Sequence, residues 1–425
     1  MIMKLKLLIL GLFCFSFSHL YSDWVLLNSY PSTLVNDILI SGGTIYTTST
    51  SGVHISTDGT VSWQSINNGL NTPQAIRCSQ VLISGNNMYV STEDGIYKSI
   101  DGGANWVRKS NGIFVGNGAL YAFCESVFEI NGMLLTGAYT GIYRSTNSGE
   151  NWIATNITGM HIWAKNFTLY NNVLYAARES GNIPGSYKST DNGVTFSPFS
   201  ISGSNLPAIT FYNDGPRLYA GTIFGVYLTT NSGASWVQKN TGLTPDPYSS
   251  SILRINGVLI TSLKFGGCGM FISYNNGDQW IDFGQGLPFL TEINKVVQFN
   301  TKILIGTSNG IYQRNVSELT GINPVSNEIP GRFELYQNYP NPFNPETKIK
   351  FNIPLLRGMS EGRGVLTSLS IYNILGEEVD ILVNQELQPG IYEVKFDGTN
   401  LPSSVYYYSL QAGDFKETKK MILIK

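Results

Sequence analysis

Short stretches in which apolar and polar residues alternate fill the chain between residues 25 and 315, separated by turns rich in glycine and asparagine. One group of four such stretches covers residues 75–83, 87–91, 95–100 and 106–110. Alternation with a period of two puts every second side chain on the same face of a strand, whereas a helix requires a period near 3.6. Each group of this kind therefore predicts four short antiparallel strands.

A three-residue mark shows that these groups are repeats. It consists of a glycine, usually an aliphatic residue, and then an aromatic residue or histidine. Its seven copies begin at Gly52, Gly95, Gly141, Gly185, Gly225, Gly269 and Gly310. The copies are spaced 40 to 46 residues apart. A period near 40–45 with four short strands in each repeat is typical of the blades of a β-propeller. The pattern predicts an all-β chain with a seven-bladed β-propeller at residues 23–320.

A second mark, Ser/Thr-x-Asp/Asn-x-Gly-x-x-Trp, follows six of the seven copies. Its residues are Ser56, Asp58 and Trp63; Ser99, Asp101, Gly103 and Trp106; Ser145, Asn147, Gly149 and Trp152; Ser189, Asp191, Gly193 and Phe196; Thr229, Asn231, Gly233 and Trp236; and Ser273, Asn275, Gly277 and Trp280. Thr60 replaces the glycine in the first copy, and Phe196 replaces the tryptophan in the fourth. The mark resembles the Asp-box (BNR) repeats of sialidase-like and related propellers.

The chemistry of this mark suits the tip of a β-hairpin. An Asp or Asn side chain accepts hydrogen bonds from backbone amides nearby, and glycine adopts positive φ without a Cβ penalty. The tryptophan then covers the hairpin with a large apolar face. A calcium or ligand site at each Asp is the alternative, but Asn replaces Asp in three copies, which would weaken a cation site. We therefore interpret these residues as structural.

The seventh repeat lacks its outer strand. Its three predicted strands cover residues 295–299, 302–307 and 310–315, and no Trp-led strand follows them. Residues 24–28, near the start of the chain, resemble the Trp-led fourth strands of other repeats. We expect this segment to form the outer strand of the seventh blade, which would close the ring and cover two sheet edges.

Residues 321–332 interrupt the repeats with Asn, Pro, Ser and Gly and are predicted to form a linker. Alternating segments follow, for example at 348–351 and 392–396, with Gly and Pro turns between them. This pattern predicts a small, seven-stranded, Ig-like β-sandwich at residues 333–425.

Motifs in residues 333–425 closely resemble the type A C-terminal sorting domain of type IX secretion substrates. The matching residues are Tyr339, Pro340, Asn341, Pro342, Phe343, Asn344, Pro345, Gly376, Lys419 and Lys420. Ser404 departs from the family, which usually has glycine there, and residues 355–366 form a longer loop. The resemblance implies recognition by the outer-membrane translocon and removal by its sorting peptidase near residues 320–335, in a Gram-negative bacterium of the Bacteroidota type. An ordinary adhesive Ig-like module is the alternative.

Residues 1–22 are predicted to be an export signal peptide. Lys4 and Lys6 provide a positive start, residues 7–17 are apolar, and a polar stretch follows. An uncleaved membrane anchor is the alternative, but this apolar run is shorter than the roughly 20 residues that a membrane-spanning helix needs. No later segment approaches that length, so we expect no transmembrane span in the mature chain.

Composition narrows the functional classes. Charged residues make up only 13% of the chain and glycine contributes 45 of its 425 residues, as suits an all-β extracellular protein. Without the signal peptide, 25 basic and 29 acidic residues remain and no basic run is dense, so we expect no nucleic-acid partner. Scattered histidines and the absence of C-x-x-C predict no zinc site and no other cofactor. Cys78 and Cys124 occupy equivalent repeat positions, where two small buried side chains are favoured over a disulfide.

Catalytic candidates in the repeats are weak. A sialidase would need three convergent arginines, and Arg77, Arg178 and Arg254 lie near inner strands, but the Arg-Ile-Pro motif of those enzymes is absent. A glycosidase needs two carboxylates at a defined separation, and no pair stands out. The acidic candidates are Asp37, Glu93, Asp94, Glu125, Glu129 and Glu292. Trp163 is either a sugar-stacking residue or part of the propeller core.

The sequence thus predicts a protein that is secreted or displayed on the outer-membrane surface of a Gram-negative bacterium. Because a fold alone does not establish chemistry, we expect a non-catalytic module that binds a glycan or a surface protein. A divergent extracellular glycoside hydrolase, sialidase-like or polysaccharide-cleaving, is the alternative.

Overall fold

Backbone pairing between strands organises every part of the chain that the structure, a computed structural model, describes. The described residues are 23–32, 34–115, 121–178, 185–201, 206–264, 269–320, 323–326, 328–355, 365–387, 389–399 and 401–425. Their only helical element is a short 3₁₀ segment, η2 (Val316–Thr320), so the described chain is all-β. The predicted signal peptide, residues 1–22, lies outside the described residues.

Residues 23–315 form seven four-stranded antiparallel sheets, numbered here from the first to the seventh. The first four sheets are β2 (Asp37–Ser41), β3 (Thr44–Ser49), β4 (Gly52–Ser56) and β5 (Gln64–Ser65); β6 (Cys78–Ser84), β7 (Asn87–Thr92), β8 (Gly95–Ser99) and β9 (Val107–Arg108); β10 (Phe128–Ile130), β11 (Met133–Ala138), β12 (Gly141–Ser145) and β13 (Ile153–Thr158); and β14 (Ala164–Tyr170), β15 (Val173–Arg178), β16 (Ser186–Ser189) and β17 (Ser197–Phe199).

The other three sheets follow the same order along the chain, except that the seventh also uses a strand from the N-terminal end. They are β18 (Ala208–Asn213), β19 (Leu218–Thr222), β20 (Gly225–Thr229) and β21 (Val237–Gln238); β22 (Tyr248–Ile255), β23 (Val258–Lys264), β24 (Gly269–Ser273) and β25 (Ile281–Asp282); and β26 (Ile293–Phe299), β27 (Lys302–Thr307) and β28 (Gly310–Asn315) with β1 (Val25–Leu26).

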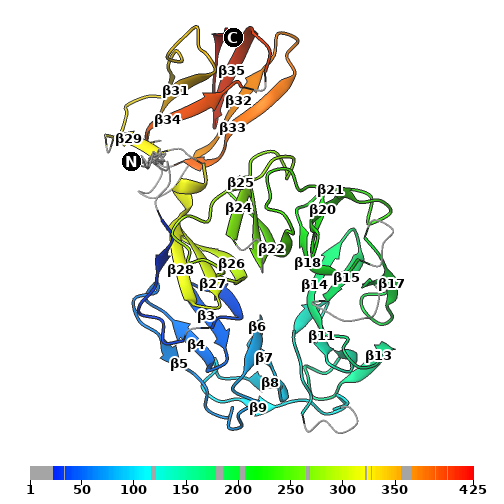
Figure 1. Ribbon diagram of the computed structural model, residues 1–425. Coiled ribbons are helices and arrows are strands. Elements are labelled where there is room, and N and C mark those ends of the chain that lie inside the picture. Colours follow the sequence, from blue (N-terminus) through cyan, green and yellow to red (C-terminus); the bar gives the residue numbers. More distant parts are fainter. Residues whose placement is uncertain are drawn as a thin grey trace, which may run out of the picture.

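The sheets surround a common centre, and the first strand of each sheet lies innermost (Figure 1). Strand β14 contacts β18, β18 contacts β22, and β22 contacts β26. Strand β2 contacts both β6 and β26, so the first and last sheets are neighbours although they are distant in the sequence. We refer to residues 23–320 as the first unit.

The seventh sheet takes its outer strand from the start of the first unit. Val25 lies opposite Gln313 and Leu26 opposite Tyr312, so β1 pairs with β28 as the sequence predicts. Trp24 precedes this strand with only 3% of its surface exposed. Its indole N–H donates to the carbonyl oxygen of Phe283 at 2.8 Å, and the two rings meet edge to face. The sixth and seventh sheets are therefore joined through the N-terminal segment.

The repeated Gly mark lies where the third strand of each sheet begins. All seven glycines have φ between +81° and +154°, in the region that other residues rarely adopt. At Gly95, an added Cβ would also come within 2.2 Å of the Ser110 Oγ atom. The aromatic residue that follows points into the core, as Tyr97 does with 5% exposure. Glycine is thus required both for the turn and for the close approach of the fourth strand.

The core of the first unit is divided into layers between neighbouring sheets. One layer combines Val53 of the first sheet with Cys78, Val90 and Trp106 of the second. Another combines Tyr89 of the second sheet with residues of the third. Because each sheet buries both faces against neighbours, a sheet is stable only within the stack.

A second unit at residues 323–425 consists of two four-stranded antiparallel sheets around one shared core. One sheet has the order β29 (Asn323–Ser326), β34 (Gly390–Asp397), β31 (Glu346–Ile353) and β30 (Glu334–Leu335). The other has the order β33 (Glu378–Leu387), β32 (Val365–Tyr372), β35 (Ser404–Ala412) and β36 (Phe415–Leu423). The described strands number eight rather than the predicted seven, because β29 lies inside the stretch predicted as a linker and pairs with β34. Among the described residues, no helix has the length and apolar character needed to cross a bilayer.

We expect Trp24→Ala to destabilise the first unit by about 3–5 kcal/mol, because it removes a large buried side chain. The substitution also removes one of the hydrogen bonds between the seventh and sixth sheets. Val25→Ala, at a side chain that is 56% exposed, is the control and should change the melting temperature little. Thermal unfolding followed by near-ultraviolet circular dichroism measures both. Equal melting temperatures for the two variants would show that the N-terminal segment is dispensable.

Candidate functional site

The six Ser/Thr-x-Asp/Asn turns share one hydrogen-bond pattern. In the second sheet, the Ser99 hydroxyl donates to Asp101 Oδ1 at 2.7 Å, and the amide of Gly103 donates to Ser99 Oγ at 2.9 Å. The amide of Asn105 donates to Asp101 Oδ1 at 2.9 Å. The equivalent bonds recur in the other five copies, at 2.7 to 3.0 Å. Because Asn147, Asn231 and Asn275 accept the same bonds as the aspartates, the turn requires an oxygen acceptor and not a charge.

Three of the five tryptophans after these turns donate a hydrogen bond to the neighbouring sheet, whereas the indole nitrogens of Trp63 and Trp236 are buried with no hydrogen-bond partner among the described residues. Trp106 Nε1 donates to the carbonyl oxygen of Ile66, which follows the outer strand of the preceding sheet, at 2.7 Å. Trp152 and Trp280 make the corresponding bonds to the carbonyls of Lys109 and Lys239, each at 2.8 Å. The sequence interpretation gave these side chains a role within their own hairpin. The bond to the neighbouring sheet was missed, although the recurrence of tryptophan, a side chain with a single N–H donor, was a signal for it.

Charge adds to the turns that contain aspartate. Hydrogen bonds from the Asn105 side chain, the Ser99 hydroxyl and the Asn105 amide lower the pKa of Asp101 to about 2. Bonds from Ser62 similarly lower the pKa of Asp58 to about 2. Burial opposes ionisation of Asp191, but bonds from Thr195 and Ser189 outweigh it and lower that pKa to about 2. The ionised form is the one that the folded turn stabilises.

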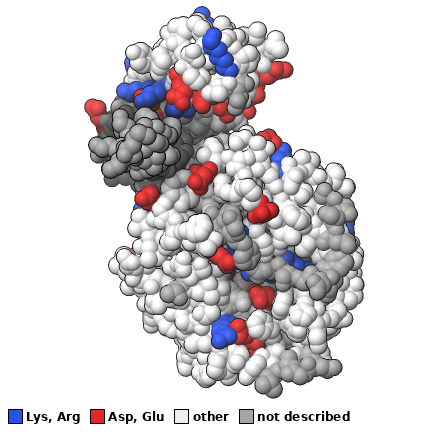
Figure 2. Space-filling model, viewed as in Figure 1, with Lys and Arg blue, Asp and Glu red and all other residues white. Residues whose placement is uncertain are grey.

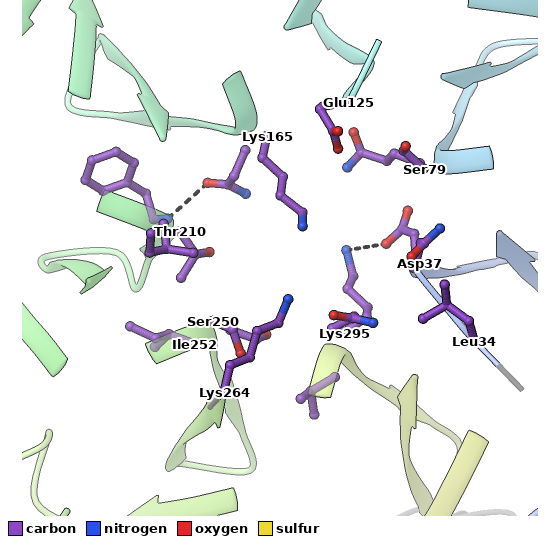
Figure 3. Close-up of a pocket in the computed structure, with 18 of the residues that line it drawn as sticks. Leu34, Asp37, Ser79, Glu125, Lys165, Thr210, Ser250, Ile252, Lys264 and Lys295 are labelled. Atoms are coloured by element: carbon purple, nitrogen blue, oxygen red, sulfur yellow. Dashed lines mark hydrogen bonds and ion pairs between the residues drawn. The ribbon is translucent and has the colours of Figure 1, made fainter. Parts of the chain in front are cut away.

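A cavity of about 540 Å³ lies at the centre of the first unit, among the innermost strands (Figure 3). Its lining comes from β2, β6, β14, β18, β22 and β26, from the end of β23, and from the residues just before β10. In the view of Figure 2, the first unit is largely uncharged, with a few charged side chains around its centre. The cavity therefore gathers charge in a protein that carries little of it.

Five inner strands contain a one-residue β-bulge near their start. At this bulge the pairing register with the second strand of the same sheet shifts by one residue. The extra residues are Ser79, Lys165, Ile209, Ser250 and Asn294. All five line the cavity. A bulge redirects a side chain without changing the rest of the ladder, and bulges are over-represented beside functional sites. The same device on five sheets marks the cavity as the best candidate site.

The acidic candidates divide into two groups. Asp37, Glu93 and Glu125 line the cavity, and the structure brings these three together. Asp37 is bound to Lys295 at 2.8 Å and Glu93 to Arg77 at 3.2 Å. Asp94, Glu129 and Glu292 are not among the lining residues. Asp94 accepts the Tyr97 hydroxyl at 2.6 Å, and Glu129 accepts the amide of Gly132 at 2.7 Å.

The three arginine candidates do not converge. Arg77 lines the cavity. Arg178 is buried and donates to the carbonyls of Ile162 and His161, at 3.1 and 3.0 Å. Arg254 is bound to Asp214 at 2.8 Å and donates to Asn276, away from the cavity lining. A carboxylate clamp of three arginines is therefore not formed by these residues.

Lysine is the basic residue that sequence reasoning missed. Lys165, Lys264 and Lys295 line the cavity and extend into it (Figure 3). Lys264 is 6% exposed, although lysine is rarely buried. In the sequence, Lys165 and Lys295 could be placed only near the predicted starts of inner strands. Their direction into the cavity follows from the bulges and the strand register, which the sequence does not give.

The remaining candidates, the two cysteines and Trp163, lie outside the lining of the cavity. Cys78 and Cys124 are free thiols and buried, as favoured from the sequence, and burial raises the pKa of Cys124 to about 12. The ring of Trp163 lies 5.4 Å from that of Tyr139 and 5.2 Å from that of His161, outside the cavity lining. Cys268 lies outside the described residues, and among those residues no group of three or more His, Cys, Asp or Glu side chains is placed to hold a metal ion.

The sorting-motif residues of the second unit lie at two places that meet. Residues 339–345 form a loop in which Tyr339 is 80% exposed and Phe343 is 2% exposed. The amide of Phe343 donates to the carbonyl of Ile422, and that of Ile424 donates to the carbonyl of Phe343, both at 3.0 Å. Gly376 adopts φ +80° in the turn before β33, and Lys419 and Lys420 lie on β36. The opening loop is thereby held against the last strand of the chain.

Replacing the three turn aspartates by asparagine, in an Asp58→Asn, Asp101→Asn and Asp191→Asn variant, should make folding less sensitive to acid. Each folded pKa lies near 2, below the ordinary value of 3.8, so the stabilisation is complete above that value and is lost as pH falls towards 2. Asparagine accepts the same bonds in the other copies and does not titrate.

The measurement is the melting temperature between pH 5 and pH 2. Between pH 5 and pH 2, the melting temperature of the triple variant should fall less than that of the native chain. The melting temperature of the converse variant, Asn147→Asp, should fall more. Parallel curves for all three proteins would mean that these carboxylates do not contribute to the pH dependence.

Residues 337–425 match the family model of the secretion system C-terminal sorting domain, which confirms the resemblance drawn from the tail motifs. A sorting tail of this kind supports handling by the type IX secretion system and a secreted or cell-surface location. No curated protein matches the chain.

Several solved structures share the fold at low identity. PorZ of Porphyromonas gingivalis, an essential surface component of its type IX secretion system, aligns with TM-score 0.58 and 14% identity over 93% of this chain and 60% of PorZ. A GH74 enzyme of Niastella koreensis aligns with TM-score 0.52 and 13% identity over 95% of this chain and 75% of the enzyme. The extracellular domain of a putative one-component system of B. thetaiotaomicron aligns with TM-score 0.52 and 12% identity over 95% of this chain and 59% of that domain. The chain thus spans about 60% of the length of PorZ and of the B. thetaiotaomicron domain. These similarities show the fold alone, which is β-propeller-like.

Proposed function

We propose that this protein is an exported, non-catalytic binding module that holds a glycan in the central cavity of its first unit. The observation that carries the proposal is the set of five bulges whose extra residues line one cavity. In β-propeller-like proteins the inner strands and their adjoining turns are the natural place for a ligand, because they line the concave centre of the ring.

The architecture that we propose is a seven-bladed propeller of Asp-box repeats at residues 23–320, followed by an Ig-like sorting domain at 333–425. The seven four-stranded sheets and the shared turn chemistry support the first part. The pairing of β1 with β28 supports closure of the ring. Two facing four-stranded sheets with a common core support the second part.

The chemistry of the lining favours a glycan over a protein surface. Amide and hydroxyl side chains are numerous in it, including Gln80, Asn166, Thr210, Ser251 and Asn294. Such groups pair with sugar hydroxyls, which both donate and accept hydrogen bonds. A concave site of this volume also suits a few sugar rings better than a flat protein epitope.

A divergent glycoside hydrolase is the second candidate, and the three cavity carboxylates favour it. Hydrolysis needs one carboxylic acid that donates a proton and a second, ionised carboxylate that is available as base or nucleophile. Ion pairs with Lys295 and Arg77 occupy carboxylate oxygens of Asp37 and Glu93. Binding without cleavage is therefore the better supported function.

Export involves the type IX translocon and its sorting peptidase as partners, acting on the second unit. The similarity to PorZ, which is itself a surface component of that system, is in keeping with a position at the cell surface. We infer that the first unit is the part of the chain that acts outside the cell, while the second unit serves its delivery.

The purified protein, incubated with a panel of immobilised polysaccharides, should be retained and release no reducing sugar. Glu125→Gln changes a cavity carboxylate and Glu129→Gln changes one outside it, so the two form a matched pair. Released sugar that disappears in Glu125→Gln but persists in Glu129→Gln would establish the hydrolase instead. If the protein is not retained and releases no sugar, the result contradicts the glycan proposal and points to a protein ligand.

The delivery role predicts that Phe343→Ala reduces export. Phe343 packs against Phe396 with ring centroids 5.8 Å apart, and its loss should cost the second unit about 3–5 kcal/mol. Tyr339→Ala, at an exposed position of the same loop, should leave the fold intact and serves as the control for stability. Fractionation of a type IX-competent host measures the exported share. Normal export of Phe343→Ala would show that the folded loop is not needed.

A further inference from the structure

Three aromatic side chains gather beside the cavity, where the third sheet meets the fourth. They are Tyr139, which follows β11, and His161 and Trp163, which lie in the connection from β13 to β14. The ring centroid of His161 lies 4.7 Å from that of Tyr139, and the centroid of Trp163 lies 5.4 Å from Tyr139 and 5.2 Å from His161. The Tyr139 hydroxyl and His161 Nε2 share a hydrogen bond of 3.1 Å. We call these three residues the aromatic cluster.

The aromatic cluster is continuous with the lining of the cavity. The amide of Tyr139 donates to the carbonyl of Phe123 at 2.8 Å, and Phe123 lines the cavity. Thr50 and Glu93 hold the position of Tyr139 in the first and second sheets, two residues before the glycine mark, and both are lining residues. The cluster therefore lies at the rim of the cavity, in line with residues that already face it.

The segment that carries two of these rings is held in an unusual backbone conformation. The φ angle is +63° at His161 and +35° at Trp163, in the left-handed region that large side chains rarely adopt. Arg178, which is buried, donates from Nε to the carbonyl of Ile162 at 3.1 Å and from Nη2 to that of His161 at 3.0 Å. The amide of Ile162 donates to the carbonyl of Tyr139 at 3.1 Å. Such conformations are unfavourable and persist where neighbouring groups hold them, which is common at ligand sites.

Packing between sheets does not account for the aromatic cluster. Trp106, Trp152 and Trp280 are buried and donate to the neighbouring sheet, but Trp163 is half-buried, and its indole nitrogen has no hydrogen-bond partner among the described residues. Tyr139 is half-buried and His161 is exposed. Large aromatic side chains that are rigidly held yet remain accessible indicate a contact with a ligand.

We propose that the aromatic cluster is a second glycan subsite, where a pyranose ring that extends from the cavity lies against the rings of Tyr139, His161 and Trp163. This inference rests on the proposed glycan-binding function and adds a place and a kind of sugar. A pyranose whose substituents are all equatorial presents C–H groups on its faces, and such a face packs on an aromatic ring without burying a hydroxyl. The Tyr139 hydroxyl and the His161 imidazole supply hydrogen-bonding groups for the edge of the sugar ring.

Titration calorimetry of the full-length protein with three soluble hexasaccharides tests the proposal. Laminarihexaose, made of β-linked glucose, and chitohexaose, made of β-linked N-acetylglucosamine, carry equatorial ring substituents. Mannohexaose, made of β-linked mannose, has an axial hydroxyl on each ring, which prevents flat contact on that face. We expect binding of at least one of the first two, and weaker binding of mannohexaose.

Substitutions in the aromatic cluster should weaken the binding of the preferred hexasaccharide. Tyr139→Ala and His161→Asn each remove one ring, and each should lower the affinity roughly tenfold, as loss of an aromatic ring does for stacked nucleic-acid bases. Asparagine is chosen at position 161 because it tolerates positive φ. Tyr139→Phe keeps the ring and should bind almost as the native protein does.

Tyr407→Ala removes an equal side chain at a tyrosine of the second unit that is 39% exposed, and it is the matched control. Its affinity should equal that of the native protein. The melting temperature of each variant separates loss of the fold from loss of the subsite. If Tyr139→Ala unfolds early, His161→Asn, at an exposed side chain, decides the question.

Three results would overturn the inference. Native affinity in both His161→Asn and Tyr139→Ala would remove the subsite while leaving glycan binding in the cavity. Mannohexaose bound as tightly as the other two hexasaccharides would remove the stacked geometry. If none of the three binds, the inference is contradicted, and retention of the protein on the polysaccharide panel then shows whether the proposed function survives without it.

Discussion

The constraint on which the rest of the structure depends is the junction between neighbouring sheets of the first unit, where side chains pack and hydrogen bonds run from one sheet to the next. The backbone ladders of the first unit run within single sheets. Neighbouring sheets are joined by packing and by hydrogen bonds outside the ladders, which come from both backbone amides and side chains. Trp106, Trp152 and Trp280 each reach the sheet before their own. Trp24 makes the equivalent bond from the N-terminal segment, and so brings the seventh sheet into the same series.

Within each repeat, the residue type is restricted at some positions and free to vary at others. The turn, the tryptophan and the glycine mark lie on the outer two strands, where hydrogen bonds and positive φ restrict the residue type. The bulged start of the inner strand carries none of these constraints. Ser79, Lys165, Ile209, Ser250 and Asn294 are chemically unlike although their positions are equivalent. A ligand site is thus able to vary without loss of the ring.

Residue patterns were sufficient for the features that depend on local chemistry. The repeated glycine, the acceptor side chain of each turn and the Trp-led segment at residues 24–28 could be recognised because each needs a particular residue at a fixed offset. The cavity could not be recognised from the sequence, because the direction of the Lys165 side chain depends on a bulge. Only the pairing of β14 with β15 reveals that bulge. Arg77 and Arg254 were both candidates near inner strands, but only the structure shows that Arg254 is bound to Asp214 of another sheet. Strand β29 was missed because Pro and Asn in Asn323–Ser326 are typical of linkers.

The junction of the first and seventh sheets links the stability of the ring to the candidate site. Within the seventh sheet, β1 pairs with β28; between the first and seventh sheets, Asp37 of β2 is bound to Lys295 of β26. Asn294 Nδ2 also donates to the carbonyl of Val35, at 2.9 Å, across the same junction. Asp37, Asn294 and Lys295 also line the cavity, so the residues that join the first and seventh sheets are among those that a ligand would contact. The carboxylate of Asp37, which is 7% exposed, has little access to water in place of Lys295, so loss of this ion pair would leave a buried charge at the junction.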